Sequence, residues 1–539
     1  MEEFNHEYIK TPGFRTGHAP HLENKADRRL YRFLEMVPGL LAWGSILLIV
    51  FLSYFKPVWA AYFIIAFDLY WVLKTAHLSL HHRHNWKRLR HNMKVDWNEM
   101  LEPLKHDHLH HMIILPSFKE ERSIVETAVV SLLESKYDTK KIMVVLAMEE
   151  RAGEVPRIMA EQLKEEYGDK FGDLIITIHP KDIPGELAGK GSNITYAAER
   201  AKIEILDKKE IKYEDVLVSA FDVDTIVGDQ YLSCLTWHFL TTEDRYNASY
   251  QPVPLYNNNI WEAPSFSRVA AMSSTFWQMI QQERQEKLTT FSSHSVPFSV
   301  LEKIGYWQTN MVSEDSRIFW NLWFAHNGNY KVVPISYPVL MDANLTPNFL
   351  STAIGVYKQH LRWGWGVENV PYIMFNCIKH KQISLKVKIK HIVNQLEGFW
   401  SLATNPLVIL LLGWLPLILG GSAFRDSILS YNLPLVTRNL MVLAMGGLVL
   451  SAIIAFTLIP PMPKEIKWRK LTWFIMGAQW LLIPITIVIF GAIPGLDGQT
   501  RLMFGKYMGF RVTPKIRKKA DKDSYKQALE DDALKNKKG

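Results

Sequence analysis

Two carboxylates follow a short β-branched run near the middle of the chain. The run DVLVSAF at 215–221 predicts a buried strand, and Asp222 and Asp224 come directly after it. In open α/β folds, ligands bind at the carboxyl ends of parallel strands. One or two carboxylates and substrate phosphates are usual ligands of Mg²⁺, which can neutralise the charge of a departing diphosphate. Taken singly, however, a pair of aspartates at a strand end is more often part of a turn.

A second acidic pair lies later in the chain. Glu314 and Asp315 follow Ser313 and precede the run SRIFWNLWF, which has the pattern of a helix. Both carboxylates are therefore expected at or near a helix N-terminus. In isolation, this arrangement is more often an N-cap with charges that favour the helix dipole than a reactive site.

The third feature combines a cation with an aromatic ring. Gln359, Arg362 and Trp363 lie within the sequence QHLRW, which Gly-Trp-Gly follows. A guanidinium group can hold phosphate oxygens in a bidentate manner, and the neighbouring indole offers a flat apolar face. Alone, an Arg-Trp pair near an apolar run is more often an anchor at a membrane interface.

These three features need a scaffold that brings them together. From about 111 to 345 the chain alternates β-branched runs with amphipathic stretches, a pattern typical of an α/β domain with a largely parallel sheet. The predicted strands are MIIL at 112–115, KIMVVLA at 141–147, DLIITI at 173–178 and DVLVSAF at 215–221, with helices near 120–134, 154–167 and 190–208.

Long apolar runs flank this region on both sides. Residues 38–55 and 57–80 are each long enough to cross a bilayer at about 20 residues per span, which predicts a transmembrane hairpin. With three further apolar runs later in the chain, five spans would place the two chain ends on opposite sides of the membrane. Both ends, however, are expected on the cytosolic side. A sixth crossing or a re-entrant segment near Pro484 and Pro494 is therefore expected. The three further runs lie at 399–421, 433–460 and 473–495.

The charge pattern favours a membrane over nucleic acid as a partner. The net charge is +8, and the excess of Lys and Arg clusters beside the apolar runs at 28–32, 81–90 and 511–522. That placement follows the positive-inside rule. The first apolar run has no small-residue cleavage site after it, so no removable signal peptide is expected. The two cysteines, Cys234 and Cys377, predict reduced packing residues.

The order of the three features resembles a known family. The chain from Ile113 to Lys515 is similar to membrane-integrated family 2 glycosyltransferases, the group that contains cellulose, chitin and hyaluronan synthases. Its most specific element is the complete Gln-x-x-Arg-Trp. Weaker matches are LPSFKEE at 115–121, Lys190 in AGKGSNITYA, PFSVLEKIGYW at 297–307 before the SED motif, and GFRVTPK at 509–515, which resembles a gating segment of cellulose synthases.

The chain departs from the family pattern at several positions. After the second strand the family carries Asp-Asp or Asp-Gly to bind the nucleotide, whereas this chain has Ala-Met-Glu-Glu, in which Glu149 is the candidate substitute. Lys119 replaces an asparagine of the first-strand motif, and Thr195 falls where asparagine is common unless Asn193 takes that role. The longer glutamate leaves the identity of the nucleotide open.

The resemblance implies an inverting transfer. Asp315 would deprotonate an acceptor hydroxyl, which attacks the anomeric carbon of the sugar while the nucleoside diphosphate leaves. Asp222 and Asp224 would hold Mg²⁺ or Mn²⁺. The residues implied to contact the donor are Glu149, Lys190, Asp222, Asp224 and Arg362, and those implied to contact the acceptor are Gln359, Trp363 and Glu314.

Three functions remain open at this point. The resemblance favours a processive synthase that polymerises sugar from a nucleotide-sugar, expected to be a UDP-sugar, at the cytosolic face of the plasma or bacterial inner membrane. The alternatives are a transferase that adds one sugar to a lipid carrier and a non-enzymatic membrane scaffold. The latter would require loss of Asp224 or Asp315, and both are present.

The resemblance also predicts how the chain is divided. A GT-A-like α/β nucleotide-sugar transferase domain with a mostly parallel sheet is expected between N- and C-terminal transmembrane helices. The expected segments are a cytosolic segment at 1–37, a transmembrane hairpin at 38–80, a basic linker at 81–110, the catalytic domain at 111–345, interfacial helices with Gln-x-x-Arg-Trp at 346–398, a transmembrane region at 399–500, and a cytosolic gating-like segment with a charged tail at 501–539.

Overall fold

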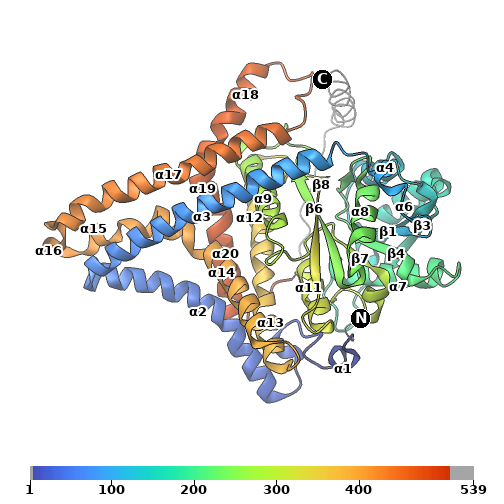
Figure 1. Cartoon of the computed structure of the whole chain (residues 1–539), viewed down its shortest axis with the longest axis horizontal. Coiled ribbons are helices and arrows are strands. Elements are labelled where there is room, and N and C mark those ends of the chain that lie inside the picture. Colours follow the sequence, from blue (N-terminus) through green and yellow to red (C-terminus); the bar gives the residue numbers. More distant parts are fainter. Residues whose placement is uncertain (1–3, 510–539) are drawn as a thin grey trace.

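An eight-stranded sheet lies at the centre of the computed structural model, which describes residues 4–509 (Figure 1). The strand order is β3-β2-β1-β4-β7-β6-β8-β5. The first four strands of this order are parallel and confirm the predicted strands. Their bounds are β1 (His110–Pro116), β2 (Ile142–Glu149), β3 (Asp173–His179) and β4 (Val216–Ala220), and the others are β5 (Ile226–Val227), β6 (Ala248–Tyr256), β7 (Ser295–Pro297) and β8 (Lys331–Met341).

Helices cover both faces of the parallel half. Successive residues of a strand point to opposite faces, so Met112 and Ile114 of β1 join one core, whereas Ile113 and Leu115 join the other. Because both faces are covered, the parallel strands are almost continuously apolar. The helices are α7 (Lys190–Ala201) and α11 (Glu314–Ala325) with the first core, and α5 (Arg122–Leu133), α6 (Glu154–Tyr167) and α8 (Tyr231–Thr241) with the second.

The remaining strands extend the sheet with mixed directions. β7 is antiparallel to β4, and β6 pairs in parallel with β8. The pairing of β6 with β8 ends at Tyr256 and Met341. Asp342 follows Met341 and therefore begins a loop at the end of the sheet where Tyr256 lies. α9 (Ser265–Gln282) packs on β6, and α10 (Phe298–Lys303) follows β7 directly.

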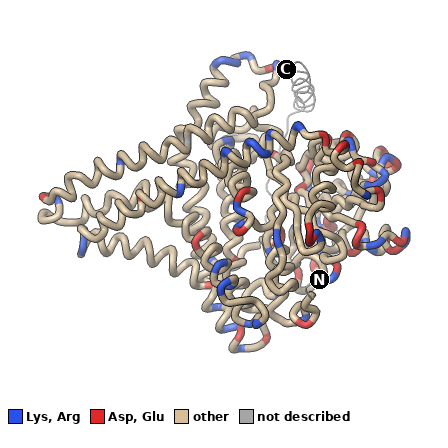
Figure 2. The backbone as a smooth tube through the Cα atoms, viewed as in Figure 1, with Lys and Arg blue, Asp and Glu red and all other residues tan. Residues whose placement is uncertain are grey.

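Long apolar helices project from one side of the sheet (Figure 1). Within residues 4–509, four stretches are long and apolar enough to span a membrane, and a bent helix pair can add a fifth. Lys, Arg, Asp and Glu are sparse along them and dense around the sheet (Figure 2). The prediction of an α/β sheet between apolar helices is therefore confirmed. The four stretches are α2 (Lys25–Phe55), α3 (Pro57–Asn92), α17 (Ile428–Leu458) and Arg469–Met503, which contains α18 (Arg469–Ala478), α19 (Ile483–Ile487) and α20 (Ile493–Met503).

The broken apolar segment lies elsewhere than expected. Pro484 and Pro494 each occupy the first turn of a helix within Arg469–Met503, where a missing N–H costs little. Residues 4–509 thus contain no separate crossing or re-entrant segment at these prolines, and that prediction is wrong as placed. The break is instead a 47° bend between α14 (Leu385–Leu410) and the stretch Leu412–Leu419.

Two helices connect the sheet to the last apolar helices. α12 (Phe349–Gly364) carries the Gln-x-x-Arg-Trp residues, and α13 (Asn369–Lys379) follows the short helix η8 (Trp365–Glu368). Tyr372, Ile373 and Phe375 of α13 belong to the main core. The free cysteines Cys234 and Cys377 are buried as predicted. The gating-like match at 509–515 lies outside the described residues except for Gly509.

Candidate active site

Three residues from distant parts of the chain meet at one point. Lys190 is the first residue of α7, Asp222 follows β4, and Asp315 lies in the first turn of α11. Lys190 Nζ donates to Asp222 Oδ1 at 2.7 Å and to Asp315 Oδ1 and Oδ2 at 3.1 and 2.9 Å. The fold therefore joins three of the candidate site residues.

The charges at this point compensate one another. Burial lowers the pKa of Lys190, but the carboxylates of Asp222 and Asp315 outweigh it and hold the pKa above its ordinary value. Lys190 is thus an ammonium ion that bridges two carboxylates.

The second aspartate of the D-x-D pair is held by the neighbouring loop. Asp224 is buried, and its Oδ2 accepts a hydrogen bond from the backbone N–H of Asp342 at 2.9 Å. Asn258 Nδ2 donates to the carbonyl oxygen of Asp224 at 3.1 Å and to Asp342 Oδ1 at 2.9 Å. The loops after β4, β6 and β8 thus fix the carboxylate that the sequence assigned to metal.

The donor set fits a divalent cation only together with a ligand. Asp222 and Asp224 supply the hard oxygen atoms that Mg²⁺ or Mn²⁺ prefers. Among residues 4–509, however, no group of three or more His, Cys, Asp and Glu side chains is arranged to hold a metal ion alone. A diphosphate would supply the missing oxygen ligands.

Glu314 differs from its neighbour Asp315. Burial raises the pKa of Glu314 to about 8, and Asp315 adds to the shift, whereas Lys190 and Arg362 oppose it. Glu314 Oε2 is buried and has no hydrogen-bond partner among the described residues. A protonated carboxyl group here can donate a hydrogen bond, which a second carboxylate cannot.

The nucleotide candidate lies at the end of β2. Glu149 forms an ion pair with Arg151, whose guanidinium carbon lies 4.5 Å from the ring centroid of Phe118. Asn193 Nδ2 donates to the carbonyl oxygen of Ala147 at 2.8 Å, so Asn193, not Thr195, reaches this strand end. Glu149 pairs with Arg151 and not with Lys190, so it forms a separate part of the site among the described residues.

Two of the three acceptor candidates line a small pocket beside the D-x-D loop. Gln359 and Trp363 of α12 line it together with Tyr256 and Asp342. The indole of Trp363 is 37% exposed and lies 6.0 Å from the ring of Tyr256. Burial and the carboxylates Asp222 and Asp224 raise the pKa of Tyr256, and Arg362 and Lys190 oppose this, so all these charges act on one ring.

Sequence reasoning missed a histidine at this site. His294, from the polar run SSHS before β7, is fully buried, and its Nδ1 lies 3.8 Å from Asp315 Oδ1. Tyr256 and Asp342 were also missed, because only the pairing of β6 with β8 brings them next to Asp224. A histidine within a serine-rich run shortly before the SED motif was the available signal for His294.

The family assignment agrees with this geometry. Residues 217–490, slightly more than half of the chain, match the family described as Glycosyl transferase family group 2. The chain belongs to this family. The matched region contains Asp222, Asp224, Asp315 and Arg362, whereas Lys190 precedes it. As a family 2 glycosyltransferase with a GT-A-like fold, the protein takes a nucleotide-sugar donor.

Solved structures with low similarity to the chain include two in complex with a nucleotide-sugar. One is the mannosyltransferase PcManGT from Pyrobaculum calidifontis in complex with GDP-Man and Mn²⁺, with 13% identity, a TM-score of 0.37, and coverage of 79% of this chain and 99% of that one. Another is residues 1–349 of S. aureus TarS in complex with UDP-GlcNAc, with 11% identity, a TM-score of 0.33, and coverage of 65% and 91%. No curated protein sequence matches the chain.

Proposed function

We propose that this family 2 glycosyltransferase is an inverting, processive enzyme that polymerises sugar from a nucleotide-sugar at the cytosolic face of a membrane and extrudes the product. The observation that carries the transfer chemistry is the contact of Lys190 with both Asp222 and Asp315. Through Lys190, the part of the site that would bind the diphosphate contacts Asp315, the proposed base.

The donor occupies the carboxyl edge of the parallel strands. Glu149 binds the nucleoside, and Lys190 and Arg362 bind the diphosphate. Asp222 and Asp224 would hold Mg²⁺ or Mn²⁺, which supplies positive charge next to the departing oxygen. Asp224 suits this task because the backbone N–H of Asp342 fixes its orientation.

The acceptor meets the sugar from the side of Asp315. The acceptor hydroxyl oxygen bonds to the anomeric carbon, its proton passes to a carboxylate oxygen of Asp315, and the bond from that carbon to the diphosphate oxygen breaks. The configuration at the anomeric carbon inverts. Glu314 and Gln359 orient the acceptor, and the indole of Trp363 supports the face of its sugar ring.

Processivity is supported by how the acceptor helix meets the membrane helices. A Cβ built on Gly364, which ends α12, would lie 3.2 Å from the Cα of Gly495 in α20. The Trp363 platform therefore adjoins the last apolar stretch with no side chain between the two backbones. A polymer leaving this platform has the apolar helices immediately beside it.

The decisive experiment is turnover by purified protein. UDP- and GDP-sugars are supplied with Mg²⁺ or Mn²⁺, and product length is measured for the wild type and for Asp315→Asn. A long product that the substitution abolishes supports the proposal. A product with one added sugar on a lipid carrier would replace processive synthesis by single transfer. Turnover unchanged by the substitution would remove Asp315 as the base.

A further inference from the structure

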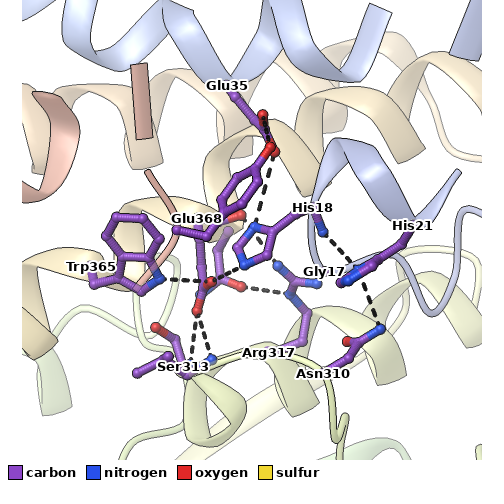
Figure 3. Close-up of polar contacts among 12 residues, drawn as sticks. Gly17, His18, His21, Glu35, Asn310, Ser313, Arg317, Trp365 and Glu368 are labelled. Atoms are coloured by element: carbon purple, nitrogen blue, oxygen red, sulfur yellow. Dashed lines mark hydrogen bonds and ion pairs between the residues drawn. The ribbon is translucent and has the colours of Figure 1, made fainter. Parts of the chain in front are cut away.

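A buried carboxylate that the mechanism does not use binds the turn that precedes Asp315, the proposed base. Glu368 ends η8, five residues after Trp363, and is fully buried. Its Oε1 accepts hydrogen bonds from the backbone N–H groups of Ser313 at 2.8 Å and Val312 at 3.3 Å. Trp365 Nε1 donates to Oε2 at 2.9 Å (Figure 3). One carboxylate thus holds the two residues that precede Glu314 and Asp315.

A second contact holds the same turn from its other end. Arg317, fully buried in α11, donates from Nε to Asn369 Oδ1 at 2.6 Å and from Nη2 to the carbonyl oxygen of Glu368 at 3.2 Å. Asn369 Nδ2 also donates to Ser316 Oγ at 2.8 Å. Residues 368 and 369 therefore hold the chain on both sides of Asp315.

Segments from both ends of the described chain support Glu368. The ring of His18 lies between Glu368 and Glu35, with Nε2 3.5 Å from Glu368 Oε2 and Nδ1 4.0 Å from Glu35 Oε1 (Figure 3). Tyr507 stacks on His18 at 4.1 Å and donates from its hydroxyl to Glu35 Oε2 at 2.9 Å. The carboxylate therefore has little freedom to move.

We propose that Glu368 is the positioning residue that fixes Asp315 relative to Arg362 and Trp363. The inference rests on the proposed function, in which Asp315 is the base. Asp315 is far in sequence from Arg362 and Trp363. Only a short backbone stretch separates Glu368 from Trp363. A base displaced by about 1 Å loses much of its efficiency, so a group that links both parts controls the rate.

The first variant is Glu368→Gln, which keeps the shape of the side chain. Its amide oxygen can serve Val312 and Ser313 only if its NH₂ group faces the N–H of Trp365, which places two donors together. We expect kcat to fall about tenfold or more while the KM for the nucleotide-sugar changes less than about threefold. A role in stability alone would lower the melting temperature and leave kcat per folded molecule unchanged.

The conflict between donors provides a rescue test. In Glu368→Gln combined with Trp365→Phe, the opposing N–H is gone and the amide oxygen can face Val312 and Ser313 again. We expect the double variant to have a higher kcat than Glu368→Gln alone, a non-additive result. Additive losses would overturn the proposal.

Hydrogen exchange supplies a measurement that needs no turnover. The peptide containing residues 312 and 313 should exchange faster in Glu368→Gln, and unchanged exchange would overturn the proposal. Glu283→Gln is the matched control, because Glu283 is a buried carboxylate that pairs with His84 and Asn85 outside this network. It should alter neither kcat nor exchange at 312 and 313.

The two hypotheses fail in different ways. If Asp315→Asn abolishes turnover and Glu368→Gln does not reduce kcat, the positioning role is wrong and the proposed function stands. If Asp315→Asn retains turnover, the assignment of the base is wrong whatever Glu368→Gln does.

Discussion

The imidazole Nδ1 of His294 lies 3.8 Å from Oδ1 of Asp315. Trp307 Nε1 donates to His294 Nε2 at 3.1 Å, so the ring proton is on Nδ1, which donates to the carbonyl oxygen of Phe291 at 2.7 Å. Burial lowers the pKa of His294, and Asp315 offsets this only in part. A neutral imidazole therefore packs beside Asp315, the proposed base.

Replacement of His294 should lower kcat because it disturbs the packing beside Asp315. We expect His294→Leu, which leaves the Trp307 N–H without its acceptor, to lower kcat about tenfold, and His294→Gln, which can still accept, to retain most of it. The measurement is kcat per folded molecule, with melting temperature as the check on folding. His111→Leu is the control, because His111 is equally buried but bonds to Thr236 away from the base. Equal activity of the Leu and Gln variants would contradict the prediction.

Glu314 should set the alkaline limb of the activity profile. Its pKa, raised to about 8 by burial and by Asp315, keeps the carboxyl group protonated below pH 8 and charges it above that value. A new negative charge beside Asp315 then opposes approach of the diphosphate, so kcat/KM should fall above pH 8. Glu314→Gln should keep its activity at pH 7 and lose this fall. The check is kcat/KM between pH 6 and 10, and an alkaline limb that survives in the variant would contradict the assignment.

Acid should destabilise the fold through buried histidines. Burial lowers the pKa of His326 to about 4, so between pH 6.5 and 4 the unfolded chain binds a proton that the folded chain does not. Stability is therefore present above pH 6.5 and falls with decreasing pH by about 1.4 kcal/mol per pH unit for such a group. The same sign holds for His18 and His111, whose pKa values burial lowers to about 3.

His326→Phe isolates this effect. Both ring nitrogens of His326 are buried without a hydrogen-bond partner among residues 4–509, so phenylalanine loses no bond and removes the titration. We expect the variant to melt at a higher temperature than the wild type at pH 5, with a smaller difference at pH 8. His91→Phe, at an exposed position, is the control. An equal dependence of melting temperature on pH in wild type and His326→Phe would refute the expectation.

Sequence patterns predicted the parallel half of the sheet because its strands are buried on both faces. Each predicted strand lies within or overlaps an observed one, since apolar β-branched runs between helical patterns admit few other structures. β6 and β8 were not predicted. They contain Pro252, Pro254, Pro334 and Pro338, residues that argue against a strand interior, and they pair in parallel across a register shift.

The candidate site likewise contains residues that the sequence indicated and residues that it did not. Asp222 was a candidate because a carboxylate at the end of a predicted strand is visible in sequence, whereas Lys190 and the role of Asp315 came from the family resemblance. The contact of Lys190 with both aspartates is created by the fold. Glu368 and His18 could not be found, because their roles depend on contacts with Ser313 and Glu35 that only the tertiary structure creates. A buried carboxylate within the helical sequence WGVEN carries no pattern that distinguishes it from a surface glutamate.

The contact between α12 and α20 should control product length. A Cβ on Gly364 would lie 3.2 Å from Gly495 Cα and 3.4 Å from the carbonyl oxygen of Pro494, so Gly364→Val must push the two helices apart. Overpacking of this kind costs about 1–3 kcal/mol, which a protein of this size can survive. We expect shorter products, because the platform of Trp363 separates from the apolar helices that receive the polymer, with little change in the rate of donor hydrolysis by water. Gly398→Val is the matched control, since nothing lies within 4 Å of a Cβ at that position of α14. Products of normal length from Gly364→Val would mean that the close approach of these helices serves packing and not transfer of the polymer.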